Sequence, residues 1–140
     1  MAIQYALPVG TIVLCDYSMG GFRAPEMVKR RPAIILSPRL PHRDGLCTVV
    51  PVSGSAETRE LPYIVRLDFD HELPSPFPFK VFWAKCDMLA TVAFGRLDMF
   101  RTDRDQTGRR KYLRPMLMPP QIDSVKQGVL FALGLERPKL

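Results

Sequence analysis

A cluster of charged side chains leads directly into an apolar run near residue 31. Glu26 lies five residues before Arg31, and Lys29 and Arg30 add two further cations. Pro32 fixes its own φ at about −65°, lacks a backbone N–H and favours an extended conformation at Arg31. An arginine held at the start of a rigid strand is well placed to bind a phosphate group. The alternative is a solvated basic loop that leads into an ordinary core strand.

Two later segments carry polar residues that could serve the same site. Ser53 and Ser55 flank a glycine in a small polar loop, where a ligand could approach the backbone closely. A plain flexible connector is the alternative reading of this loop. Lys85 and Asp87 alternate with Cys86, so we expect them to share one face at the end of a strand.

The segment from 101 to 114 is the most basic part of the chain. It carries six basic residues against two acidic ones, a net charge of 6 − 2 = +4, and residues 105–108 are typical of a hairpin turn. The hairpin either solubilises the protein or forms a basic wall beside an RNA groove. Its basic residues are Arg101, Arg104, Arg109, Arg110, Lys111 and Arg114.

The cysteines and histidines do not indicate a metal or cofactor site. Cys15, Cys47 and Cys86 are odd in number, widely spaced and without CxxC spacing, so we expect reduced thiols in the core. His42 and His71 lie in proline-rich loop sequence without a metal-ligand partner nearby. A catalytic histidine pair is the less favoured alternative.

Length, composition and charge limit the function classes. The 140 residues suit one domain, which we place at 1–140 with a core at about 8–135. With 46% apolar and 24% charged residues, the chain is expected to be ordered and soluble. It shows neither an apolar run of about 18 residues nor a signal peptide, which predicts a cytoplasmic protein without membrane contact. A net charge of +6 favours an acidic partner, with nucleic acid the leading candidate.

Hydrophobic periodicity predicts a mainly β protein. Short strands, many turn prolines and one C-terminal helix indicate a small, strongly curved antiparallel barrel. Strands two and three are expected to pair with each other, and the helix stripe (Ile122, Val125, Val129 and Leu133) to pack on the barrel or at a subunit interface. The segments at 88–92 and 94–100 are ambiguous. Strands are predicted at 11–17, 33–36, 46–53, 63–70 and 79–87, and the helix at 119–134.

Several segments in this order resemble the PemK/MazF toxins of type II toxin–antitoxin systems. They are residues 8–17, the Arg31-Pro32 unit with its apolar run and Ser37-Pro38, residues 49–53, and residues 83–97. The resemblance implies an SH3-like antiparallel barrel with a C-terminal helix. It further implies a homodimer that cuts single-stranded RNA at short sequences without a metal or other cofactor. A cognate antitoxin protein would cover the RNA groove, and DNA would be contacted only through the antitoxin complex.

The resemblance also assigns residues. Catalytic positions match Glu26, Arg31, Ser53, Lys85 and Asp87, and we expect RNA-binding roles for Lys29, Arg30, Ser55, Arg101, Arg109 and Arg110. Glu26 is the expected general base, with Asp87 as the rival. Arg31 would hold the phosphate, Ser53 would donate a hydrogen bond to it, and Lys85 would assist the leaving oxygen. Departures from the family pattern at Val28-Lys29-Arg30, Gly54, Met88 and the basic segment affect above all the expected cleavage sequence.

Two other functions stay open from the sequence. One is a catalytically inactive barrel that binds RNA or an antitoxin through the same basic surface. The other is a relative that poisons DNA gyrase. That activity depends on an aromatic C-terminus in such relatives, whereas this sequence ends Arg137-Pro-Lys-Leu140.

Overall fold

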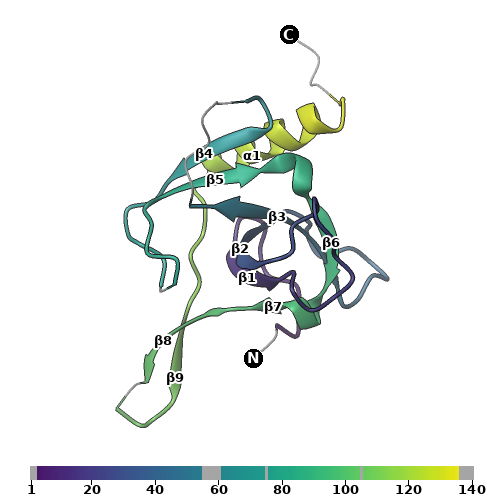
Figure 1. Ribbon diagram of the computed structural model, residues 1–140. Helices are drawn as coiled ribbons and strands as arrows, with labels where there is room; N and C mark the ends of the chain where they lie inside the picture. Colours follow the sequence, from purple (N-terminus) through teal and green to yellow (C-terminus); the bar gives the residue numbers. More distant parts are fainter. Residues whose placement is uncertain (1–2, 55–60, 75, 105, 136–140) are drawn as a thin grey trace.

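The computed structural model describes residues 3–54, 61–74, 76–104 and 106–135, and shows a bent antiparallel sheet with one helix (Figure 1). The predicted fold class, mainly β with a C-terminal helix, is confirmed. The strands are β1 (Ile12–Asp16), β2 (Arg30–Ile35), β3 (Leu46–Ser53), β4 (Ile64–Asp68), β5 (Val81–Lys85), β6 (Ala90–Ala93), β7 (Leu97–Asp98), β8 (Phe100–Arg104) and β9 (Arg110–Leu113). The helices are the 3₁₀ turns η1 (Cys86–Met88) and η2 (Phe94–Arg96) and the α-helix α1 (Pro119–Ala132).

The central strand β3 changes partners halfway along. The sheet order is β4-β5-β3-β2-β1-β7, and β6 pairs with β3 outside this path. β3 pairs with β6 through residues 46–49 and with β5 through Val52 and Ser53. Pro51, which has no N–H to donate, lies between these two ladders, as expected for a proline at an irregular position. Within the described residues no ladder joins β4 to β7, so "barrel" describes this sheet only loosely.

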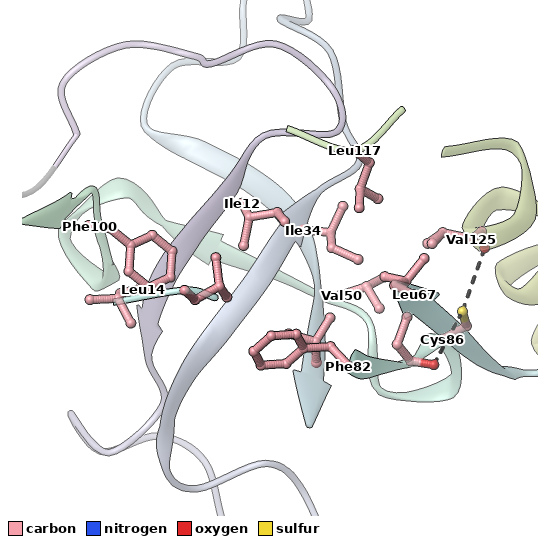
Figure 2. Packing of buried hydrophobic residues seen from close by; sticks show 13 residues of the cluster. Ile12, Leu14, Ile34, Val50, Leu67, Phe82, Cys86, Phe100, Leu117 and Val125 are labelled. Carbon is pink, nitrogen blue, oxygen red and sulfur yellow. Dashed lines mark hydrogen bonds between the residues drawn. The ribbon is translucent and has the colours of Figure 1, made fainter. Parts of the chain in front are cut away.

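Strand alternation separates two hydrophobic clusters. The helix-side cluster takes Ile12, Ile34, Val50, Leu67 and Phe82 from five strands, together with Val125 of α1 (Figure 2). The loop-side cluster takes the alternate positions of β1 to β3. Its members there are Val13, Cys15, Ala33, Ile35, Cys47 and Val49. Because β1, β2 and β3 are apolar on both faces, this part of the sheet is covered on both sides.

The helix docks through three of the four residues of the predicted stripe. Val125 is buried in the helix-side cluster, Ile122 and Val129 are partly buried against it, and Gly128 is also buried. The prediction that Leu133 belongs to the packed stripe is wrong, because the helix ends before it and its side chain is 55% exposed. Gly134 follows with a φ of 72°, the left-handed conformation that ends many helices.

Several predicted boundaries need correction. β2 begins at Arg30 rather than Ala33, because Asp16 and Cys15 of β1 pair with Arg30 and Arg31. The predicted fifth strand stops at Lys85, where η1 begins. The ambiguous segment at 88–92 forms most of β6, and the segment at 94–100 contains a helical turn followed by strand β7.

The basic segment forms the hairpin β8–β9, which extends away from the sheet and from α1 (Figure 1). Its pairing is irregular between Arg101 and Arg104. Among the described residues, no helix has the length and apolar character needed to cross a bilayer.

Candidate functional site

The predicted cation Arg31 lies on the loop-side face of the sheet. Arg31 pairs with Cys15 across β1 and alternates with Ala33 and Ile35, both members of the loop-side cluster. The β2–β3 ladder pairs Ala33 with Pro51. Arg31 lies two residues before Ala33, and Ser53 lies two residues after Pro51, so strand alternation places both side chains on the same face.

Ser53 and Lys85 lie on that same face. Ser53 pairs directly with Trp83 of β5, and cross-strand partners project to the same side of an antiparallel sheet. Lys85 lies two residues further along β5 and is half-buried, whereas Phe82 and Ala84 point into the helix-side cluster. Ser53 is only 4% exposed, so its hydroxyl lies at the floor of the face. The register thus brings Arg31, Ser53 and Lys85 to one surface from three strands.

The Nε atom of Arg31 is unusual because it is buried and, within the described part of the chain, unpaired. Its side chain is half-buried, and its Nε atom is fully buried without a hydrogen-bond partner among the described residues. A buried N–H donor is normally paired, since leaving one unpaired costs roughly 1–3 kcal/mol. An anionic oxygen bound at this face could satisfy the donor. Among the described residues, no partner accepts a hydrogen bond from this Nε, so the donor remains free for a bound acceptor.

The two rival bases share one pocket. Glu26 and Asp87 both line a cavity of about 460 Å³, together with Tyr17, Phe22 and Met88. The Glu26 carboxylate accepts a hydrogen bond from the backbone N–H of Arg23 at 3.2 Å. The structure thus places both predicted carboxylates at one opening, although they are 61 positions apart in the chain.

Asp87 reaches this pocket from a helical turn. The prediction that Lys85 and Asp87 share a strand face is wrong, because Asp87 lies in the first turn of η1. Its side chain is exposed, and the turn is anchored by the fully buried Cys86. This turn links the pocket to the sheet face, since Lys85 immediately precedes it at the end of β5.

Arg96, which the sequence did not single out, holds the loop that carries Glu26. Its Nη1 donates to the backbone oxygen of Asp16 at 3.2 Å and its Nη2 to that of Gly20 at 2.6 Å. Its guanidinium lies 4.8 Å from the centre of the Phe22 ring, which in turn packs edge-on against Tyr17. No local motif predicts this role, because the contacts join residues that are 76 to 80 positions apart in the sequence.

The carboxylate of Asp16 lies beside one of the predicted RNA-binding residues, Arg30. Lys29 and Arg30 are exposed, but Arg30 stands opposite Asp16 in the β1–β2 ladder. The hydroxyl and backbone N–H of Ser18 both donate to Asp16. The hydroxyl hydrogen bond is the main cause that lowers the pKa of this carboxyl, with smaller contributions from the Arg30 and Arg96 charges. Asp16 is therefore ionised beside Arg30 and partly offsets its charge.

Of the predicted site residues that the structure describes, only Glu26 and Asp87 line the pocket, and the predicted hairpin residues lie apart from it. Arg101 is exposed and forms an ion pair with Asp98 at 3.5 Å, and Arg109 is exposed near the tip of the hairpin. Arg110 pairs with Arg104 in the same hairpin. Among the described residues, none that lines the Glu26–Asp87 pocket comes from β8 or β9. Ser55 lies outside the described residues.

The cysteines are buried thiols, as predicted, and burial raises the pKa of Cys15 to about 11 and that of Cys86 to about 12. Within the described ranges, no group of three or more histidine, cysteine, aspartate or glutamate side chains lies together as a metal site would require.

Comparison with known proteins identifies a family model and a relative that match most of the chain. The sequence model of PemK-like, MazF-like toxins of type II toxin–antitoxin systems matches residues 9–113. The Escherichia coli K12 protein YifN is 26% identical over 151 residues, which cover 96% of each chain.

Two solved structures share the fold. An endoribonuclease in complex with its cognate antitoxin, from Mycobacterial species, superposes with a TM-score of 0.57 at 20% identity, covering 95% of this chain and 100% of that one. MazF from Deinococcus radiodurans gives a TM-score of 0.57 at 19% identity, with coverages of 93% and 98%.

Proposed function

Because the chain belongs to the family of PemK-like, MazF-like toxins of type II toxin–antitoxin systems, we propose that it is an endoribonuclease that cleaves single-stranded RNA. The observation that carries this proposal is the buried, unpaired Nε of Arg31 on the sheet face that also holds Ser53 and Lys85. An arginine fork matches the oxygens of a phosphodiester and stays charged at any working pH.

In the proposed reaction the RNA supplies its own nucleophile. The 2′-hydroxyl loses its proton to a carboxylate, and its oxygen forms a bond to phosphorus while the bond from phosphorus to the 5′-oxygen breaks. Lys85 donates a proton to the departing 5′-oxygen. Arg31 stabilises the negative charge that accumulates on the phosphoryl oxygens. The products are a 2′,3′-cyclic phosphate and a 5′-hydroxyl, and the scheme requires no metal.

The geometry favours Asp87 over Glu26 as the base. Asp87 follows Lys85 by two residues, and its turn is fixed by the buried Cys86. Glu26 lies in an exposed turn, where its carboxylate already accepts the Arg23 N–H. Catalytic groups act best when rigid neighbours hold them in place. In this proposal Asp87 takes the proton, and Glu26 shapes the loop at the mouth of the pocket.

The test is cleavage of a mixed single-stranded RNA pool in the presence of a chelator. Wild type should cut with cyclic-phosphate ends, and Arg31→Ala should lower the rate on the order of 100- to 1000-fold. Asp87→Asn should lower it more than Glu26→Gln. Equal cutting by wild type and Arg31→Ala, or loss of cutting on chelation, would refute the scheme. Binding without cutting would instead support an inactive RNA-binding module.

The proposal includes the partners expected for the family. We propose that the chain forms a homodimer, acts as the toxin of a toxin–antitoxin pair in the cytoplasm, and is inhibited by a cognate antitoxin. One of the similar structures is an endoribonuclease in complex with its antitoxin, which supports this assignment. Copurification of the chain with the product of a neighbouring small gene, together with loss of RNA cutting in that complex, would test it.

A further inference from the structure

The sheet face of Arg31 and Ser53 continues across two more strands. Ser53 pairs with Trp83 of β5, and Trp83 pairs with Arg66 of β4. Ser53, Trp83 and Arg66 form a line of directly opposed residues across β3, β5 and β4, and Arg31 of the next strand, β2, lies on the same face beyond the Ser53 end of this line. Neighbouring strands lie about 4.8 Å apart, so the backbone positions of Ser53 and Arg66, which are two strands apart, are separated by about 10 Å along this line.

Arg66 projects to the same side as the other members of the line. It alternates in β4 with Val65 and Leu67, which both contact the helix-side cluster. Its own side chain is 52% exposed. Trp83, between the two cationic ends, is almost buried and forms an apolar floor. A cation thus stands at each end, and the residues between them, Ser53 and Trp83, are buried and uncharged.

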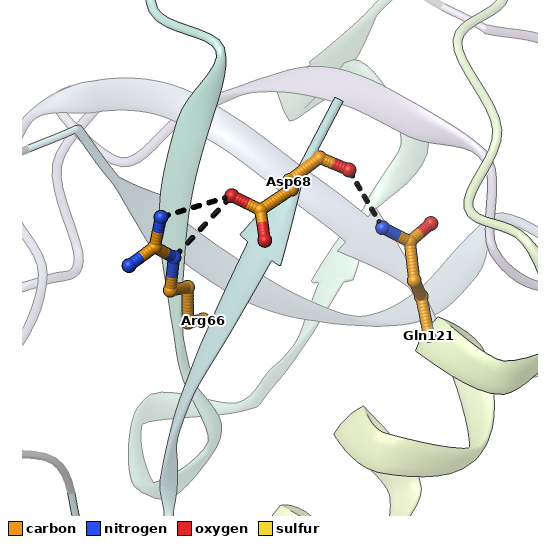
Figure 3. A network of polar contacts seen from close by, with 3 residues as sticks. All are labelled: Arg66, Asp68 and Gln121. Atoms are coloured by element: carbon orange, nitrogen blue, oxygen red, sulfur yellow. Dashed lines mark hydrogen bonds and ion pairs between the residues drawn. The ribbon is translucent and has the colours of Figure 1, made fainter. Parts of the chain in front are cut away.

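The guanidinium of Arg66 is held in place without being enclosed. Its Nε and Nη2 donate to one carboxylate oxygen of Asp68, at 3.3 and 3.2 Å (Figure 3). The backbone oxygen of Asp68 accepts a hydrogen bond from the Gln121 amide of α1 at 2.8 Å, which ties this strand end to the helix. An arginine has five N–H donors, and this pairing engages those on Nε and Nη2 only. In the described part of the chain, the Nη1 group has no acceptor, so it can bind a further one.

We propose that Arg66 binds a backbone phosphate of single-stranded RNA at least one nucleotide away from the scissile phosphate at Arg31. This inference rests on the proposed function and extends its binding site along the strand-crossing line. A solvent-exposed ion pair is weak, so Asp68 orients Arg66 without competing strongly for it. The contact is sequence-independent, because phosphates carry no base information. It therefore affects affinity for the RNA strand, while the bond-breaking step depends on Arg31, Lys85 and the carboxylates.

The test compares Arg66→Gln with Arg39→Gln, which makes the same charge change at an exposed position beyond the opposite end of β2. Binding is measured by fluorescence anisotropy over a salt series, using a labelled single-stranded 2′-O-methyl RNA that lacks the nucleophilic hydroxyl. Arg66→Gln should weaken binding about fivefold and lower the salt slope by about 0.7, the value for one phosphate of a single strand. Arg66→Lys should keep the slope, and Arg39→Gln should behave like wild type.

Cleavage of ordinary RNA provides the second measurement. Arg66→Gln should raise KM with little change in kcat, and the effect should disappear on the shortest RNA that wild type still cuts. The inference is overturned if Arg66→Gln keeps the wild-type slope and KM, or if Arg39→Gln loses as much. A wild type that binds RNA through Arg66 but cuts none refutes the proposed function alone. A wild type that neither binds nor cuts RNA refutes both.

Discussion

Replacing Gly128 by alanine tests how closely the helix approaches the turn that carries Asp87. Gly128 is buried in α1, where an added Cβ would lie 2.6 Å from the Cys86 sulfur and 3.0 Å from a methyl carbon of Val65. Cys86 is fully buried and donates weakly to the Val125 carbonyl of the helix (Figure 2). The sulfur therefore has no open space into which it can retreat.

Two opposing effects determine the magnitude. Alanine favours the helical backbone over glycine by about 1 kcal/mol. Overpacking of a tight core costs about 1–3 kcal/mol, and here the cost falls toward the upper end because the contact closes on a fully buried neighbour. We therefore expect Gly128→Ala to lower the free energy of unfolding by about 1–2 kcal/mol. For a domain of this size, that corresponds to a fall in Tm of about 3–8 °C.

The assay is urea and thermal unfolding followed by circular dichroism. Gln127→Ala, at the exposed neighbouring position of the same helix, is the control and should change stability by less than about 0.5 kcal/mol. The double variant Gly128→Ala/Cys86→Ala removes the sulfur that the new methyl group would meet. It should be more stable than the sum of the two single effects predicts, because the contact residues are coupled.

The result that refutes this reasoning is a Gly128→Ala protein as stable as wild type, or more stable. That outcome would mean that the gain in helix propensity outweighs the steric cost at Cys86, so α1 packs less closely against η1 than these distances indicate. Purely additive effects in the double variant would likewise show that the Cys86 sulfur is not the limiting contact.

Two further predictions concern the loop anchor and the buried thiols. Arg96→Ala should leave the fold intact but free the segment around Gly20 and Phe22, lowering kcat/KM for RNA about tenfold and exposing the segment to limited proteolysis. Arg96→Lys should recover part of the lost kcat/KM and part of the resistance to proteolysis. An Arg96→Ala protein that is cleaved by the protease no faster than wild type would contradict the anchoring role. Burial raises the pKa of the Cys15 and Cys86 thiols from 9.0 to about 11 and 12, so the unfolded chain loses these protons first. The stabilising contribution is complete below pH 9 and is lost as the pH rises toward 12. Urea midpoints measured across this range should fall, more steeply than in Cys86→Ala, and a flat profile would contradict the burial of the thiols.

Local sequence patterns predicted most of the secondary structure and the position of Arg31 at the start of a strand. Apolar runs bounded by glycine and proline predicted the principal strands, and proline at the start with Gly134 at the end predicted the helix. The Arg31-Pro32 unit marked the start of a strand, because proline restricts both its own backbone and that of the preceding residue. Strand ends were less predictable, since tertiary pairing extended β2 back to Arg30 and η1 ended β5 at Lys85.

Which residues face one another was decided by the tertiary structure alone. Register between strands depends on pairings that are distant in sequence, and a shift of one residue would turn every side chain to the other face. That register aligns Ser53, Trp83 and Arg66 and places Arg31 on the same face, and the loop contact of Arg96 spans about 80 positions. The amino-acid sequence by itself determined the charge, the apolar strands and the family motif. Only the folded chain determined that Glu26 and Asp87 share a pocket, because long-range pairing sets distances that no local pattern encodes.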